Sequence, residues 1–158
     1  MLSITDLPSG WSVDNSPHNA SSSCYSNPLT KVASTSYTHA DFAKGGSLPS
    51  LSEELGTYSS STTAFSTIAS TLNGCKSFNE TSGTESISGT MGPMSAPTYG
   101  DQSAAWTATL TIQGVDANQG FVMVRKGSYL MIVALGDIGA LDNSTLQGFV
   151  AQALAKVP

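Results

Sequence analysis

The chain has 158 residues, and only 11% of them are charged, well below the roughly 25% typical of soluble proteins. The net charge is −5, and the few lysines and arginines form no basic stripe, which excludes an obvious surface for nucleic acid or an anionic membrane. No apolar run approaches the roughly 18 residues that a membrane-spanning helix needs. The length suits a single domain, residues 1–158, with a real buried core.

The N-terminal part of the chain is predicted to contain little regular structure. Residues 2–11 are predicted to form one short helical turn, which Pro8 and Gly10 end. Residues 12–28 are polar and rich in serine, which is typical of a loop. Residues 31–40 carry β-branched side chains and a tyrosine and predict a strand, and residues 43–50 predict a turn.

The next segment predicts an amphipathic helix. Apolar side chains recur at helical spacing over residues 51–72. Ser50 can cap this helix, with Glu53 completing a capping box, and Asn73–Gly74 would end it. Glu53 and Glu54 would then lie in the first turn, where the helix dipole favours negative charge.

Strands dominate the following half of the sequence. Alternation and turn residues predict strands over residues 76–81, 86–91, 103–113, 120–126 and 128–135. The last two form a hairpin across Lys126-Gly127. Residues 129–135 are apolar on both faces, so this strand is expected at the centre of the sheet.

A second amphipathic helix is predicted at the C-terminal end, opened by a capping box of Ser144 and Gln147. Its apolar side chains are expected to pack on the sheet opposite Trp106, Leu110 and Ile132; they are Leu146, Phe149, Val150 and Leu154. The order of elements predicts an α+β fold, in which two amphipathic helices pack on an antiparallel sheet.

The two cysteines, Cys24 and Cys75, belong to no CxxC motif and to no Cys/His cluster, so they are poor candidates for metal ligands. We expect them to form a disulfide, which would close a loop of about 50 residues and contribute roughly 4 kcal/mol. Such a bond indicates a domain outside the cytoplasm. Two unrelated buried thiols are the alternative.

Motifs for catalysis, metals and cofactors are absent from the sequence. There is no G-x-S-x-G elbow, no H-E-x-x-H helix, no EF-hand and no Walker loop, so neither an enzyme nor a cofactor is predicted. His39 could act as a general base held by Asp41, although a surface pair at a turn is the favoured interpretation. A cleft that joined His39 and Asp41 to a serine would favour hydrolysis.

A binding role is the preferred hypothesis. The strand over residues 103–113 carries Trp106, Leu110 and Ile112 on one face. Its other face is rich in hydroxyl groups, and the candidate ligand-binding residues there are Thr107, Thr109 and Thr111. A mixed second face needs a cover, a ligand or a partner, and cover by the N-terminal loops is the simpler explanation. A ligand would be apolar or weakly polar; the alternative is an interaction module for another surface protein, without a pocket.

Several short motifs occur in an order that is similar to a known family. They are ITDLPSGW (Ile4 to Trp11), the NGC that ends at Cys75, GDQSAAW (Gly100 to Trp106), VMVRKG (Val122 to Gly127) and the Gly136-Asp137 turn. The chain resembles the extracellular sensor-like domain of actinobacterial, mycobacterial-type receptor Ser/Thr kinases and of related secreted lipoproteins. The resemblance implies an α+β fold with a ligand-binding cleft and without catalytic residues. It also implies a secreted or lipid-anchored domain of the cell envelope.

Overall fold

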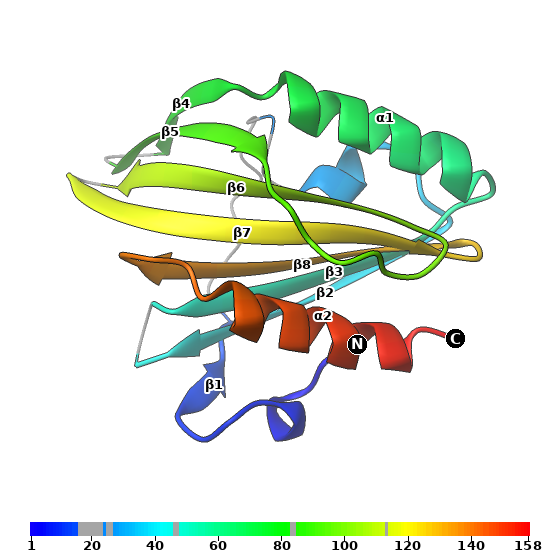
Figure 1. Cartoon of the computed structure of the whole chain (residues 1–158), viewed down its shortest axis with the longest axis horizontal. Coiled ribbons are helices and arrows are strands. Elements are labelled where there is room, and N and C mark those ends of the chain that lie inside the picture. Colours follow the sequence, from blue (N-terminus) through cyan, green and yellow to red (C-terminus); the bar gives the residue numbers. More distant parts are fainter. Residues whose placement is uncertain (16–23, 25–26, 46–47, 83–84, 113) are drawn as a thin grey trace.

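The fold is built on one antiparallel sheet of eight strands, seen in a computed structural model that describes residues 1–15, 24, 27–45, 48–82, 85–112 and 114–158 (Figure 1). The strands lie in the order β1-β2-β3-β8-β7-β6-β5-β4. Their bounds are β1 Trp11–Val13, β2 Ser36–Lys44, β3 Ser50–Thr57, β4 Ser77–Ser82, β5 Glu85–Pro93, β6 Gln102–Ile112, β7 Val115–Lys126 and β8 Tyr129–Ile138. The helices are η1 Ile4–Asp6, η2 Pro28–Lys31, α1 Ser61–Gly74 and α2 Asn143–Lys156. The predicted α+β architecture with two main helices is confirmed.

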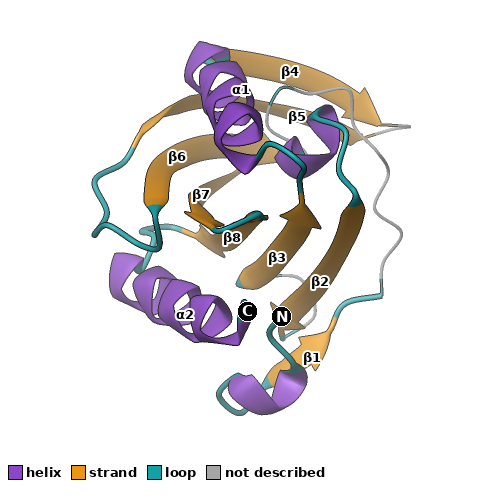
Figure 2. Ribbon diagram, turned by 90° about the vertical axis from the view of Figure 1, so that its right-hand side faces the viewer, coloured by secondary structure: helices purple, strands orange, loops and turns teal. Residues whose placement is uncertain are grey.

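The two long helices cover opposite faces of the sheet, which we name the α1 face and the α2 face after the helix on each. Figure 2 shows the sheet curving around η2, with α1 and η2 on one side and α2 on the other. The core of the α1 face includes Phe65, Ile68, Leu72, Trp106, Phe121 and Ile132. The core of the α2 face includes Val122, Val133, Leu146, Phe149, Val150 and Ala153. Since both faces are covered, the central strand β8 is apolar on both, as its sequence predicts.

The partners of the C-terminal helix differ from those that we expected. Leu146, Phe149 and Val150 pack on the α2 face, and Leu154 lies partly buried beside them. However, Trp106, Leu110 and Ile132 lie on the α1 face, in the other core. Successive side chains of a strand point to opposite faces. When both faces are buried, alternation along the strand does not show which helix covers which face.

Residues 50–57 form a strand, where the sequence predicted the start of a helix. This strand, β3, pairs with β2 on one side and with β8 on the other, and α1 begins only at Ser61. Glu53 and Glu54 are therefore not charges of a helix start: they are buried on opposite faces of the sheet. The spacing of Leu51, Leu55 and Tyr58 fits a helix, but pairing on both edges of the strand outweighs that local preference.

Smaller differences concern the ends of elements. The N-cap of α2 is Asp142, whose carboxylate accepts hydrogen bonds from the backbone N–H groups of Ser144 and Thr145, so the cap precedes the predicted Ser144. The strand expected at residues 31–40 begins at Ser36, because residues 28–31 form η2. Residues 11–13 form a short edge strand instead of a turn and loop. Most of the loop expected at residues 12–28 lies outside the described residues.

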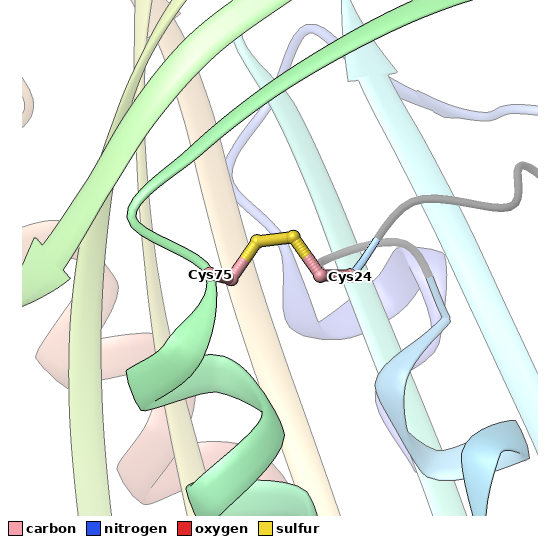
Figure 3. The surroundings of a disulfide bond; sticks show 2 residues. All are labelled: Cys24 and Cys75. Carbon is pink, nitrogen blue, oxygen red and sulfur yellow. A yellow bond between two sulfur atoms is a disulfide. The ribbon is translucent and has the colours of Figure 1, made fainter.

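The predicted disulfide is present and joins Cys24 to Cys75, with their Cα atoms 5.7 Å apart (Figure 3). Cys75 follows the last residue of α1 directly and is 3% exposed. The bond thus holds the C-terminal end of α1 to the segment that leads into η2. In the described part of the chain, no helix has the length and apolar character needed to cross a membrane.

Candidate functional site: a cleft on the α1 face

The concave α1 face carries a cleft of about 530 Å³ beside η2. Six neighbouring strands contribute side chains to it, because each sends alternate residues to this face. The described lining residues are Asp14, Asn27, Pro28, His39, Asp41, Phe42, Ser50, Leu51, Ser52, Glu54, Ile87, Ile112, Gln119, Phe121, Ile132 and Ala134. A volume of this size lies within the range of small-molecule sites.

One side of the cleft is acidic and polar, and it is formed by β2 and β3. The register places His39 opposite Glu54 and Asp41 opposite Ser52, so these four side chains share one face. Asp14, just beyond β1, lies beside them, and its backbone N–H donates to the carbonyl of Asp41 at 2.8 Å. Asp14, Asp41 and Glu54 therefore all line this side of the cleft.

The other side of the cleft is apolar, and it is formed by β8, β7, β6 and β5. Phe121 lines it from β7 and stacks on Trp106, with ring centroids 6.2 Å apart. Ala134 of β8 lies opposite Phe121, and Ile132 lies two residues further along β8. Ile112 of β6 lines the cleft further along the sheet, where it pairs with Val115 of β7. Gln119 interrupts this surface, and its side-chain Oε1 is buried without a hydrogen-bond partner. The polarity of the cleft thus changes along the order of the strands.

Glu54 is the most buried carboxyl group of the cleft, at 9% exposure. Its Oε2 accepts hydrogen bonds from the backbone N–H of Leu29, at 3.2 Å, and from the hydroxyl of Tyr37, at 3.3 Å. Burial outweighs these bonds and raises the pKa of Glu54 from 4.5 to about 7. This carboxyl group therefore gains and loses its proton near neutral pH.

Its neighbour Glu53 lies on the α2 face, outside the cleft, and is fully buried. The backbone N–H of Leu2 donates to its Oε2 at 2.6 Å, whereas Oε1 is buried without a partner. Burial is the main cause that raises the pKa of Glu53. Adjacent residues of one central strand thus carry a buried carboxyl group on each face of the sheet.

The three threonines singled out from the sequence lie on the α2 face, on the opposite side of the sheet from the cleft. Thr109 and Thr111 line a shallow depression there, together with residues of β4 and β5. Their hydroxyl groups donate to the side chains of Asn118 and Asp116, at 3.1 and 2.8 Å. The hydroxyl of Thr107 donates to the carbonyl of Gln119 at 3.3 Å. A ligand site on these threonines stays a prediction.

His39 and Asp41 both belong to β2, and not to a surface turn. The imidazole Nε2 lies 3.7 Å from a carboxylate oxygen of Asp41, and the histidine side chain is 49% exposed. Ser50 and Ser52 line the same cleft. The structure thus brings together the three residue types that a hydrolase would use, although 3.7 Å exceeds hydrogen-bond distance. The described residues include no group of three or more His, Cys, Asp or Glu that could hold a metal ion.

Sequence reasoning missed Glu54, Gln119 and Phe121 as lining residues. The signal for Glu54 was available: polar residues at alternate positions in β3 (Ser50, Ser52, Glu54) are typical of a strand with one polar face. Gln119 carried a weaker signal, because it is a polar residue just before the apolar run from Phe121 to Val124. Phe121 carried none, since a buried aromatic residue is usually part of a core.

No protein-family model matches the chain, and no curated protein matches it. The resemblance to sensor-like domains therefore stays a prediction.

Proposed function

We propose that this chain is a non-catalytic binding domain of the bacterial cell envelope, and that it holds a small ligand in the cleft of the α1 face. In this proposal the domain works outside the cytoplasm, either secreted or anchored by a lipid. The resemblance to sensor-like domains and the Cys24–Cys75 disulfide support this location.

The observation that carries the proposal is the cleft itself. It is concave, with an apolar side formed by β8, β7, β6 and β5 and a polar side formed by β2 and β3, and a concave surface that combines apolar area with placed polar groups is typical of a ligand site. Gln119 adds a specific argument, because its buried Oε1 has no partner in the described structure. A buried acceptor without a partner costs about 1–3 kcal/mol, and a ligand that donates a hydrogen bond would offset that cost.

Two substitutions on neighbouring residues of β6 test which face binds the ligand. The side chain of Ile112 lines the cleft, whereas that of Thr111 lies on the α2 face. Ile112→Trp should fill the cleft, and Thr111→Trp should leave it open. Native mass spectrometry after incubation with cell-envelope lipid and glycan extracts should show a ligand on the wild type and on Thr111→Trp, but not on Ile112→Trp.

Loss of the ligand from Thr111→Trp but not from Ile112→Trp would place the binding site on the α2 face. If no ligand is found on the wild type or on either variant, the domain is better described as an interaction module for another surface protein. A stability measurement on both variants accompanies the experiment, so that loss of the ligand is separated from loss of the fold.

Hydrolysis is the second candidate function, because His39, Asp41 and Ser52 share the cleft. A serine nucleophile needs a hydrogen bond to the histidine and a carboxylate that orients the ring. The 3.7 Å separation of His39 from Asp41 does not supply the second of these contacts. We therefore expect no esterase activity against p-nitrophenyl esters beyond that of the Ser52→Ala variant. A rate that falls at least about a hundredfold in that variant would establish the hydrolase instead.

A further inference from the structure

We infer that the ligand of this cleft is an uncharged molecule with a hydroxyl group and an apolar body. The hydroxyl group lies over β8 at Gly136, between Ser50 of β3 and Gln119 of β7, and the body lies over Ala134 and beside Phe121. This inference rests on the proposed function and names the chemistry of the ligand.

The polar part of this site is a pair of side chains that flank one glycine. The register pairs Gly136 of β8 with Ser50 on one side and with Gln119 on the other. Residues directly opposite each other on neighbouring strands share one face of the sheet, and both Ser50 and Gln119 line the cleft. The two polar side chains therefore stand on either side of a position that has no side chain of its own.

The glycine lets these two side chains converge. A Cβ atom at Gly136 would lie 2.9 Å from the hydroxyl oxygen of Ser50 and 4.0 Å from Cγ of Gln119. The same point is 3.8 Å from a methyl carbon of Leu48. Both polar side chains thus reach toward one point above β8, and a methyl group at Gly136 would push the serine hydroxyl away from it.

The hydrogen bonding of Gln119 indicates what the ligand must supply. Its Oε1 is buried and has no hydrogen-bond partner in the described structure. An amide oxygen only accepts hydrogen bonds, so the ligand group beside it has to donate one. A hydroxyl group can donate to Gln119 and at the same time accept from the hydroxyl of Ser50, because it carries both a donor and acceptor lone pairs.

The immediate surroundings of Gln119 favour an uncharged donor. Its neighbours on the same face are Gly136 and Ala108 on the adjoining strands, and Ala117 and Phe121 along β7. All four are uncharged, so they offer no opposite charge to an ammonium group. Burying a charge without such a partner costs far more than burying a hydroxyl group that forms hydrogen bonds.

The carboxyl groups of the cleft belong to positions further away. Glu54 is four residues from Ser50 along β3, and Asp41 lies on β2, two strand intervals from Gly136. These separations are about 13 Å and about 10 Å between backbone positions. Asp14 lies one strand further out, where its backbone N–H donates to Asp41. None of these three residues is placed to pair with a charged group at Gly136.

The apolar body of the ligand follows the direction of the strands. Ala134 and Phe121 lie two residues from Gly136 and Gln119 on the same face, about 7 Å away. Ala134 is small and lies opposite Phe121, so the aromatic ring stands higher than its neighbour. A molecule with its hydroxyl group at Gly136 would lay its body on Ala134 and against this ring, where burial of apolar surface contributes affinity.

Two probes of nearly equal size test the inference on the full chain. 4-Phenylbutan-1-ol carries the hydroxyl group, whereas 1-fluoro-4-phenylbutane carries fluorine in its place and cannot donate a hydrogen bond. Isothermal titration calorimetry gives the ratio of the alcohol affinity to the fluoride affinity. This ratio should fall at least about fivefold in Gln119→Met, which corresponds to about 1 kcal/mol, because methionine has nearly the same length but lacks the amide oxygen.

Two glycines supply a matched pair of variants. Gly136→Ala places a methyl group against the hydroxyl of Ser50 and should lower the ratio as well. Gly92→Ala makes the same change in β5 opposite Thr107, on the α2 face, where an added Cβ would meet no atom within 4 Å. It should leave the ratio unchanged. Urea unfolding of each variant shows that it is folded under the conditions of the titration.

The outcomes separate this inference from the proposed function. If the ratio is the same in the wild type and in Gln119→Met, or if it falls as much in Gly92→Ala as in Gly136→Ala, a hydroxyl ligand at Gly136 is ruled out and the cleft remains a binding site. Failure of both probes to bind at millimolar concentration would also rule it out. Failure of the proposed function itself is read separately, from Ile112→Trp and the envelope extracts.

Discussion

Replacing Glu54 by glutamine should stabilise the protein, and the gain should depend on pH. The pKa of this carboxyl group rises from 4.5 to about 7 on folding, because burial penalises the charged form. Below pH 4.5 the group is protonated in both the folded and the unfolded state, so it costs nothing. Between pH 4.5 and about 7 the unfolded chain loses its proton while the folded chain keeps it, so stability falls as the pH rises.

The size of the effect follows from the same values. At about 1.4 kcal/mol per pH unit, a pKa that rises from 4.5 to about 7 corresponds to roughly 3 kcal/mol at pH 8. Glutamine keeps an oxygen that can accept from the Leu29 N–H and the Tyr37 hydroxyl, although its NH₂ group needs a partner. A gain of about 1–3 kcal/mol at pH 8, and close to zero at pH 4, is therefore expected.

Urea unfolding of the wild type and of Glu54→Gln at pH 4, 6 and 8 measures this difference. Glu53 also has a raised pKa, but it is present in both proteins and its contribution cancels in the comparison. A difference in unfolding free energy that stays constant between pH 4 and pH 8 would refute the argument. So would a variant that is less stable than the wild type at pH 8. A confirmed gain would mean that the chain keeps Glu54 at a cost to stability, as expected for a residue that serves binding.

Three further predictions concern the fold. No thiol should react in the denatured, non-reduced protein, and reduction of Cys24–Cys75 should lower stability by roughly 4 kcal/mol; two reactive thiols per chain would contradict this. Phe149→Ala should cost about 3–5 kcal/mol in urea unfolding, because Phe149 is 5% exposed on the α2 face, and a cost below about 1 kcal/mol would show that α2 is peripheral. Asp142→Ala should cost about 1 kcal/mol through loss of the N-cap, and an unchanged unfolding midpoint would place the start of α2 elsewhere.

The sequence predicted the correct secondary structure where the local pattern of apolar residues agrees with their burial in the fold. The alternation around Trp106, the doubly apolar strand over residues 129–135 and the stripe that contains Phe149 each correspond to an observed element. The disulfide also followed from the sequence, because the chain has two cysteines and lacks a metal motif.

Prediction failed where long-range pairing decides the structure. Residues 50–57 have helical spacing, yet β2 and β8 pair with them along both edges. That error placed Glu54 at an exposed helix start and so concealed the acidic end of the cleft. The cleft itself joins residues from Asp14 to Ala134, and no short-range pattern reveals which strands lie side by side.

The central claim is that a ligand occupies the cleft of the α1 face, and intermolecular nuclear Overhauser effects test it most directly. With a ligand from the envelope extracts bound to ¹³C-labelled protein, protons of the ligand should contact side chains of Phe121, Ala134 and Ile132, which line the cleft together. Contacts to the methyl groups of Thr109 and Thr111 on the opposite face would contradict the account.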